Sequence, residues 1–487
     1  MMRNFVYGFV VFYSLSYTLG EEFNLFGDAG QAYSVEVNLG HPPQKFNLLV
    51  DTGSTTLAIA SQAQQGGKSF FKANESSSIW DSGKQVQAKY SQGMWVGHLA
   101  SDWVQFPSLP NIPKVRTDLA LITESHKFFM NGSGWQGLLG LAYLPVGAWG
   151  ENIIVESWLD SVDRTLKKPI SFQLKLCGVK SATNATHYGN LQMLEGHIHS
   201  HTYQTPVLRQ RWYEVGVLSV RVIDTTTGVN NTASTQSPMV TDINNEICLK
   251  LNEEKSIVDS GTTNIRLPDT VFREVRLFYD QAKCMHKIVG QIRNAVPETN
   301  VISDEFWYHG EAGCWPQPQE WSLPWIAIDL LSVDADNQYF TLEIPPQNYM
   351  RVVSAGEAGA DFVCYKLGLE AGTETVLGYT AMEGLQVLFN RSAGWIGWQA
   401  SDCGSNARVS GPYNASTSLI DSCQLRRPVS ETAVSIRAAQ WALCAISIIA
   451  AGVLVYLLAP CVKALCKKPL RMQQISLSTA ALVEQET

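Results

Sequence analysis

The amino-acid sequence predicts a mainly β protein that contains two equivalent halves. Two short strings, Asp51-Thr52-Gly53-Ser54 and Asp259-Ser260-Gly261-Thr262, each follow an apolar run and lie 208 positions apart. Each string is followed later by an apolar pair beside a glycine, at residues 137–140 in one half and 375–378 in the other. A strand that passes close under a carboxylate loop needs this pattern. Its recurrence indicates that the two halves share one plan.

The strand prediction comes from alternation. From Tyr33 onward, apolar and polar residues alternate, and His41-Pro42-Pro43 then turns the chain into a second strand that ends at Asp51. Short apolar runs with glycine and proline between them recur to about residue 400. We expect few helices: one near residues 153–167, and one that starts at Pro268 and places Val271, Phe272, Val275, Phe278 and Tyr279 on one face.

Both ends of the chain have the character of targeting segments. Residues 1–20 carry Arg3 and then an apolar stretch, which is typical of a signal peptide. The alternative is an uncleaved anchor, but the stretch is short and ends in acidic residues. Residues 21–30 would be a short N-terminal segment or the remnant of a pro-segment. Residues 1–30 therefore precede the folded part.

The C-terminal end predicts a membrane anchor. Residues 438–462 hold no charge and are long enough to cross a lipid bilayer. Four cations follow within nine residues, so residues 463–487 are expected to be a cytoplasmic tail. Residues 404–437 are rich in Ser, Arg and Asn, and we interpret them as a stalk, although Cys423 could fasten its first part back to the body. The result would be a single-pass type I membrane protein with a lumenal or extracellular body.

Charge and cysteine content narrow the class. The net charge is −8 without a basic stripe, which argues against nucleic acid as a partner. Cysteines in an oxidising compartment should pair, each bridge contributing about 2–4 kcal/mol, but spacing alone leaves the connectivity open. The seven cysteines of the expected lumenal part are Cys177, Cys248, Cys284, Cys314, Cys364, Cys403 and Cys423. Because seven is odd, one thiol should stay unpaired.

Two kinds of modification site are also suggested. Cys461 and Cys466, at the inner edge of the anchor, are candidates for palmitoylation, although such cysteines are as often unmodified. Glycosylation sequons predict exposed loops on the lumenal side. They occur at Asn74, Asn131, Asn184, Asn230, Asn390 and Asn414.

The two aspartates predict acid–base chemistry. Two carboxylates in contact cannot both ionise easily, because like charges repel. Such a pair can share a proton and activate water as a general base and a general acid, without a metal, cofactor or covalent intermediate. Asp51 and Asp259 are therefore the candidate catalytic residues.

These strings resemble the pepsin-type aspartic proteases over about residues 31–400. A closer resemblance is to the membrane-anchored beta-secretases (memapsins). It rests on Ala58 in place of the usual tryptophan, Asn131-Gly132-Ser133 preceded by residues 122–130, residues 255–263 with Arg266, and the type I anchor. The resemblance implies a bilobal fold with a cleft between two β-rich lobes. Residues 31–180 would form the lobe with Asp51, and residues 181–403 the lobe with Asp259.

The resemblance also assigns roles around the aspartates. Gly53 and Gly261 would allow tight turns, Thr52 and Ser260 would bond across to the opposite loop, and Ser54 and Thr262 would donate to the outer carboxylate oxygens. The string Tyr90-Ser91-Gln92-Gly93 would be a flap supported by Trp95, although Tyr90 alone could be a surface tyrosine. Thr263, Asn264 and Arg266 would contact substrate, with a surface salt bridge as the alternative for Arg266.

By the same resemblance the disulfides would be Cys177–Cys403, Cys248–Cys423 and Cys314–Cys364, with Cys284 unpaired. The implied function is a beta-secretase-type aspartic endopeptidase of the Golgi, endosome or cell surface. It would be active at acidic pH on extended segments of membrane or secreted proteins. The alternatives are an inactive peptide-binding protein on the same scaffold, and a secreted or vacuolar digestive protease, which conflicts with the anchor.

One further motif is histidine-rich. His197, His199 and His201 alternate, so on a strand they would share one face and could bind zinc. The alternative is a polar loop between the lobes, and we expect no metal.

Overall fold

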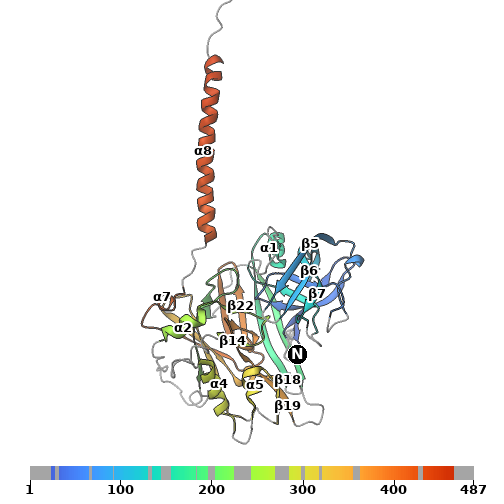
Figure 1. Cartoon of the computed structure of the whole chain (residues 1–487), viewed down its shortest axis with the longest axis vertical. Helices are drawn as coiled ribbons and strands as arrows, with labels where there is room; N and C mark the ends of the chain where they lie inside the picture. The colour runs from blue at the N-terminus through green and yellow to red at the C-terminus, as the bar shows by residue number, and fades with distance from the viewer. Residues whose placement is uncertain are drawn as a thin grey trace, which may run out of the picture. The chain divides into compact units, whose positions relative to one another are not determined.

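The structure is a computed structural model of the 487-residue chain. It describes residues 23–27, 32–64, 69–90, 93–129, 134–143, 155–181, 184–195, 203–223, 243–268, 284–297, 302–316, 321–354, 362–425 and 431–465. The expected signal peptide, the cytoplasmic tail after residue 465, Ser91, Gln92, Asn131, Asn230 and the three alternating histidines lie outside these ranges. The fold is mainly β, as the alternation predicts (Figure 1).

The first half places Asp51 at the end of a buried strand. In β3 (Gln44–Asp51) the side chains of Lys45 and Asn47 are exposed and that of Phe46 between them is buried. The last four residues of the strand are all buried. β3 pairs in parallel with β8 (Gly137–Gly140), and Asp51 lies opposite Gly140. β8 also pairs with the antiparallel strand β4 (Leu57–Ala60), which lies parallel to β7 (Val115–His126).

The second half repeats this arrangement. β13 (Ser256–Val258) pairs in parallel with β21 (Thr375–Leu377), immediately before Asp259. β21 pairs with the antiparallel strand β14 (Ile265–Pro268), which lies parallel to β20 (Leu369–Gly372). The recurrence of an apolar-apolar-glycine string after each aspartate therefore corresponds to β8 and β21, the strands beside each aspartate strand.

A large sheet joins parts of both halves. Its order is β11-β23-β22-β9-β10-β1-β2-β3-β8-β4-β7-β6-β5. The strands not yet given are β1 (Leu25–Gly27), β2 (Ser34–Leu39), β5 (Trp80–Lys89), β6 (Met94–Gln105), β9 (Ile170–Ser181), β10 (Asn184–Glu195), β11 (Tyr203–Pro206), β22 (Leu385–Asn390) and β23 (Trp395–Ala400). The expected lobe boundary at residues 180 and 181 falls within β9, which pairs with both β10 and β22. The sheet is therefore not interrupted at this boundary, because β9 pairs with strands from both sides of it.

Two further, smaller sheets are formed by the described part of the chain. One has the order β12-β16-β17-β24, and the other β15-β19-β18. Their strands are β12 (Val217–Ile223), β16 (Trp325–Leu331), β17 (Gln338–Ile344), β24 (Arg408–Asn414), β15 (Gly313–Trp315), β18 (Met350–Ser354) and β19 (Val363–Leu367). The short helices within the described residues are η1 (Ala73–Glu75), α1 (Trp158–Leu166), α2 (Asn245–Asn252), α4 (Cys284–Asn294), α5 (Asp304–His309), α6 (Pro346–Tyr349), η5 (Tyr379–Ala381) and α7 (Leu419–Ser422).

The two helix predictions have different outcomes. The helix expected near residues 153–167 is α1, which begins after Ser157, whose hydroxyl accepts a hydrogen bond from the Asp160 N–H, and ends at left-handed Lys167. The prediction that a helix starts at Pro268 is wrong at that residue. Pro268 is the last residue of β14 and pairs with Gly372. The five apolar residues of that expected helix lie outside the described part of the chain.

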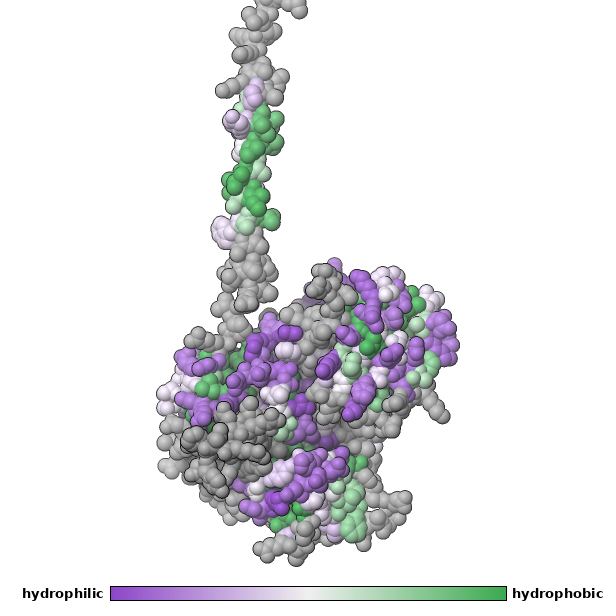
Figure 2. Space-filling view, viewed as in Figure 1, coloured by the Kyte–Doolittle hydropathy of each residue, from purple (hydrophilic) through white to green (hydrophobic). Residues whose placement is uncertain are grey.

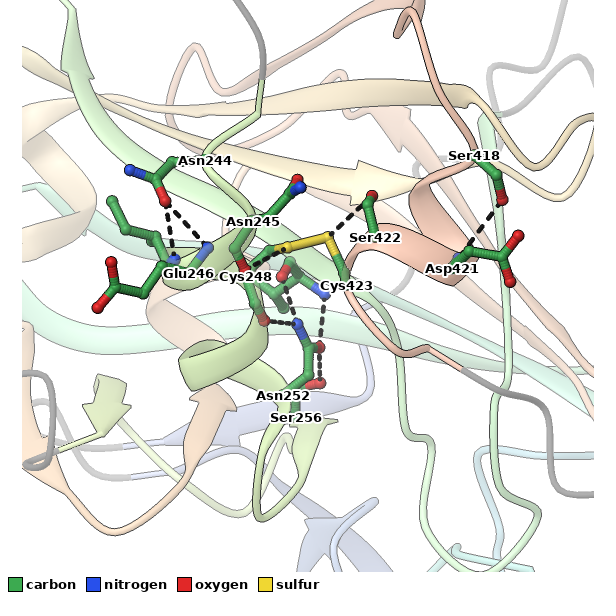
Figure 3. The surroundings of a disulfide bond; sticks show 12 residues. Asn244, Asn245, Glu246, Cys248, Asn252, Ser256, Ser418, Asp421, Ser422 and Cys423 are labelled. Atoms are coloured by element: carbon green, nitrogen blue, oxygen red, sulfur yellow. Dashed lines mark hydrogen bonds between the residues drawn. A yellow bond between two sulfur atoms is a disulfide. The ribbon is translucent and has the colours of Figure 1, made fainter.

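The expected stalk is corrected by the structure. Residues 404–425 belong to the folded body: β24 pairs with β17, and Leu419 and Leu425 are buried in a core cluster with Leu218 and Leu331. The Cys248–Cys423 disulfide fastens this segment to α2 (Figure 3). The Ser- and Asn-rich composition of this segment is typical of a linker, but here residues Arg408–Asn414 form the edge strand of a sheet. The compact unit extends to Arg426.

Three disulfides link described cysteines, with the pairing that the resemblance implies: Cys177–Cys403, Cys248–Cys423 and Cys314–Cys364. The side chains of Cys284, Cys461 and Asn184 lie outside the described set. Asn74 and Asn414 are exposed, as glycosylation requires. Asn390 does not match the prediction of an exposed loop, because it is 4% exposed and its side-chain oxygen accepts hydrogen bonds from Ser392 and Ala393.

The second unit contains α8 (Glu431–Leu465). Residues Trp441–Pro460 form a segment long and apolar enough to cross a membrane, within the wider range 438–462 that the sequence predicts. Apolar side chains cover this part of the helix (Figure 2), and Trp441, Ile448 and Tyr456 are more than 70% exposed. A helix that is apolar on all sides and unburied by protein is typical of a membrane span.

Candidate active site

Asp51 and Asp259 lie on two loops of the same construction. In each loop the aspartate ends or follows a buried strand, and a glycine two residues later turns the backbone back toward it. The Gly53 N–H donates to Asp51 Oδ1 and the Gly261 N–H donates to Asp259 Oδ1, each at 2.8 Å. The hydroxyls of Ser54 and Thr262 donate to the Oδ2 atoms of the same aspartates, at 2.5 and 2.6 Å. Each carboxylate is thus held on both oxygens by its own loop.

The two loops are joined to each other. The Thr52 N–H donates to Ser260 Oγ at 3.2 Å, and the Ser260 N–H donates to Thr52 Oγ1 at 3.0 Å. The two hydroxyls then donate onward, Thr52 Oγ1 to the Val258 carbonyl and Ser260 Oγ to the Val50 carbonyl. These four bonds are buried and reciprocal, so neither loop can shift without breaking bonds in the other.

The two carboxyl groups face each other across this junction. A Cβ atom placed on Gly53 would lie 2.7 Å from Asp259 Cγ, and one placed on Gly261 would lie 2.4 Å from Asp51 Oδ1. Real Cβ atoms do not approach other atoms this closely. Only glycine therefore allows each loop to pass the opposite carboxyl group, and this requirement explains both glycines better than turn geometry alone.

Electrostatics at the pair favour a bound proton. Burial raises the pKa of Asp51 well above its ordinary value, and the negative charge of Asp259 raises it further. The hydrogen bond from Ser54 lowers the pKa of Asp51 in part. Asp51 is 5% exposed, while Asp259 is partly exposed. A pair that holds one proton between two carboxyl groups supplies one acid and one base at the same place.

A hairpin carries Tyr90 toward the pair. β5 and β6 pair from Trp80 to Lys89, and the Tyr90 N–H donates to the Gly93 carbonyl at 2.7 Å across the turn. The buried Trp95 donates its indole N–H to the Tyr90 hydroxyl at 3.3 Å, and the ring of Phe128 stacks on that of Tyr90 with centroids 5.4 Å apart. Burial and the charge of Asp51 raise the pKa of Tyr90, so its hydroxyl stays protonated. Ser91 and Gln92 at the tip lie outside the described residues.

Acidic side chains of the neighbouring strands hold two of the residues after Thr262. Glu370 on β20 accepts from Arg266 Nε at 2.7 Å and from Asn264 Nδ2 at 2.8 Å. Arg266 is 9% exposed and the side chain of Glu370 is 26% exposed, so this ion pair is partly buried. The Thr263 carbonyl accepts from the Thr380 N–H at 3.1 Å. The structure thus brings Asn264 and Arg266 together with Glu370 beside the Asp259 loop.

Comparison with known proteins decides the family. The model of the eukaryotic aspartyl protease family matches residues 32–398, which include both aspartate loops and the hairpin. The chain belongs to the eukaryotic aspartyl protease family. The expected pepsin-like fold class is thereby confirmed.

Individual relatives agree with this family. The chain is 31% identical to beta-secretase of Strongylocentrotus purpuratus over 421 residues, which cover 82% of this chain and 71% of the relative. It is 24% identical to vacuolar protease A of Aspergillus fumigatus, over 49% of this chain and 54% of the relative. It is 26% identical to mouse pepsin A-5, over 38% of this chain and 46% of the relative. The beta-secretase resemblance thus extends over much more of this aspartyl protease than the other two.

Sequence reasoning missed two residues of the site. Phe128 supports the face of Tyr90, and Glu370 fixes Asn264 and Arg266. Phe128 lies just after β7 in the segment 122–130 that supports the resemblance, but no role is predicted for it from the sequence, and Glu370 lies 104 residues from Arg266. A buried arginine requires a carboxylate partner, which predicts that such a residue exists but not where it lies.

Proposed function

We propose that this aspartyl protease is an active, membrane-anchored endopeptidase of beta-secretase type in which Asp51 and Asp259 activate water. The observation that carries the proposal is the placement of the two carboxyl groups against each other's glycine loops. With one proton on the pair, the ionised carboxylate takes a proton from water as the water attacks the scissile carbonyl carbon. The protonated carboxyl group donates to the carbonyl oxygen, and a proton then passes to the leaving nitrogen.

The surrounding bonds keep this pair ready for reaction. Ser54 and Thr262 hold the outer oxygens, so the inner oxygens remain directed at the shared proton and the water. Geometry set before the substrate arrives costs no reorganisation during the reaction. Tyr90, supported by Trp95 and Phe128, is placed on a hairpin that would fold over a bound peptide and exclude bulk water.

The anchor favours substrates near a membrane. α8 would hold the body at the bilayer, where extended segments of membrane proteins or secreted proteins in transit are concentrated. Positive charges after the span favour a cytoplasmic tail, so the aspartate pair would act on the lumenal or extracellular side. An acidic compartment such as an endosome would keep the pair in its singly protonated state.

The test is peptide cleavage by the full-length protein and by Asp51→Asn and Asp259→Asn. Each substitution keeps the shape of the side chain but removes the titrating group, so cleavage at about pH 4.5 should fall by about 10²–10⁴-fold or more. Unchanged turnover in either variant would reject the mechanism. A native protein that binds a hydroxyethylene peptide but cleaves nothing would instead be the inactive peptide-binding protein.

A further inference from the structure

Tyr213 connects the two aspartate strands through both its main chain and its side chain. Its carbonyl accepts a hydrogen bond from the Val258 N–H at 3.0 Å, immediately before Asp259. Its phenol donates to the Leu141 carbonyl at 2.7 Å. The Leu141 N–H in turn donates to the Asp51 carbonyl at 2.8 Å. One residue therefore reaches from the strand that precedes Asp259 to the segment bonded to the main chain of Asp51.

Tyr33 has the corresponding arrangement in the first half. Its carbonyl accepts from the Val50 N–H at 2.9 Å, immediately before Asp51. Its phenol donates to Glu383 Oε1 at 2.7 Å, in the segment that follows β21, and His187 Nδ1 lies 3.1 Å from the same oxygen. Each tyrosine thus binds the aspartate strand of its own half through its carbonyl and the opposite half through its phenol.

The phenol of Tyr213 is fixed in the core of the body. Tyr213 is 0% exposed, as is Leu141, whose carbonyl accepts its hydrogen bond. The Tyr213 ring packs against those of Phe389 and Tyr143, with centroids 4.6 and 4.9 Å apart. Burial raises the pKa of Tyr213 well above its ordinary value, so the phenol stays protonated and remains a donor. A buried carbonyl that loses such a donor has no water to replace it.

We propose that Tyr213 is a positioning residue for the pair of Asp51 and Asp259. Thr52 and Ser260 join the loops that follow the aspartate strands, whereas Tyr213 joins the ends of the strands themselves. Bonds at two separate points resist rotation of one loop against the other, which bonds at a single point would permit. The inference rests on the proposed function for its effect on cleavage, but the placement of the carboxyl groups can be measured without cleavage.

Loss of the phenol hydroxyl should let the two carboxyl groups move apart. Tyr213→Phe keeps the ring and its packing but removes the donor to the buried Leu141 carbonyl. A wider separation weakens the repulsion that Asp259 exerts on Asp51 and admits water, and both changes bring the raised pKa of Asp51 closer to its ordinary value. The native protein loses stability as pH rises through that folded pKa, so the variant should lose less between pH 4 and pH 7.

The matched control is Tyr349→Phe. Tyr349 is also 0% exposed, and its phenol donates to the Pro324 carbonyl at 2.6 Å. Urea denaturation of the full-length protein in detergent micelles, at pH 4 and at pH 7, gives the midpoint for the native protein and for each variant. We expect both substitutions to lower the midpoint. The loss caused by Tyr213→Phe should be smaller at pH 7 than at pH 4, whereas the loss caused by Tyr349→Phe should be the same at both.

A second background shows whether this pH dependence comes from the aspartate pair. In Asp51→Asn the loss caused by Tyr213→Phe should be the same at both pH values, because the carboxyl group that titrates is gone. Tyr143, Arg391 and Asp163 also act on the charge of the Tyr213 phenol, and they are unchanged in this background. A pH dependence that persists there overturns the proposal. So does a loss independent of pH in the native background, or a Tyr213→Phe protein that does not fold.

Peptide cleavage at acidic pH is the second readout. For Tyr213→Phe we expect kcat to fall about tenfold with little change in KM, because small displacements of reacting groups slow the chemical step. Tyr349→Phe should retain the native kcat. An unchanged kcat in Tyr213→Phe contradicts the positioning role. If the native protein cleaves no peptide, the proposed function fails, and the urea comparison still decides whether Tyr213 positions the carboxyl groups.

Discussion

Thr52 and Ser260 each donate a backbone N–H to the other's hydroxyl oxygen, so the two aspartate loops hold one another in place. The two residues lie 208 positions apart in the chain. Each hydroxyl also donates to a carbonyl of the opposite aspartate strand. The relative position of Asp51 and Asp259 therefore depends on this exchange more than on any single loop.

The hydrogen bonds exchanged by Thr52 and Ser260 predict that removing one hydroxyl group lowers both the stability and the activity of the protein. Thr52→Val keeps the side-chain shape but leaves the buried Ser260 N–H and the Val258 carbonyl without partners. We expect the free energy of unfolding to fall by about 1–3 kcal/mol, and kcat/KM to fall with it. Urea denaturation and peptide cleavage measure the two effects. The control is Thr205→Val, because the buried Thr205 hydroxyl has no partner within the described part of the chain. Equal effects of the two substitutions would contradict this role.

The raised pKa of Asp51 predicts how stability depends on pH. Between the ordinary pKa of about 3.9 and the raised folded value, the native state holds a proton that the unfolded state releases. This contribution is fully present below the ordinary value and is lost as pH rises through the folded value. Asp51→Asn has no such loss, so its stability relative to the native protein should increase from pH 4 to pH 7. Denaturation at both values measures this, with the exposed Asp81→Asn as the control. A difference independent of pH would show that the carboxyl group is not buried against Asp259.

The hydrogen bond within the hairpin predicts that loss of the Trp95 indole N–H weakens substrate binding. Trp95→Phe removes the hydrogen bond to Tyr90 but keeps an aromatic ring. We expect KM to rise about fivefold, which corresponds to about 1 kcal/mol. Trp135→Phe is the matched control, because the Trp135 indole N–H has no partner among the residues described. Combining Trp95→Phe with Tyr90→Phe should add little, because both remove the same bond. Full additivity would place Tyr90 and Trp95 in separate roles.

The contacts of residues 404–425 with the rest of the folded body predict which C-terminal truncations the protein tolerates. A chain that ends at Arg426 retains β24, the Cys248–Cys423 disulfide and buried Leu419 and Leu425. A chain that ends at Cys403 loses all of them, and the disulfide alone contributes about 2–4 kcal/mol. We expect the longer chain to be secreted as a stable protein and the shorter one to be retained or degraded. Secretion yield and thermal unfolding measure the difference. Equal yield and stability would restore the stalk interpretation for residues 404–425.

The sequence predicts what is local and repeated. Aspartate, hydroxyl residue and glycine stand next to one another in each string, so the turn and the hydrogen bonds within each loop follow from adjacent residues. The strands beside them are equally visible, because each is an apolar pair with a glycine. Membership of a family with two such loops then predicts that the halves meet.

What the sequence does not predict depends on distant partners. Glu370 beside Arg266, Phe128 against Tyr90 and Glu383 beside His187 are contacts between segments that no local pattern connects. Composition is misleading for residues 404–425, which contain the sheet strand β24, and for Asn390, whose side chain is buried although Ser392 of the same sequon is exposed. Burial of a polar side chain is a tertiary property, so a sequence motif alone could not show it.

The most direct test of the shared-proton pair is the pH dependence of kcat/KM for peptide cleavage by the full-length protein. One carboxyl group must be ionised and its neighbour protonated, so the rate should pass through a maximum at acidic pH and fall on both sides. Asp51→Asn and Asp259→Asn should remove the activity across the whole range. A rate that rises steadily toward alkaline pH, or that persists in either variant, would show that these two aspartates do not perform the reaction.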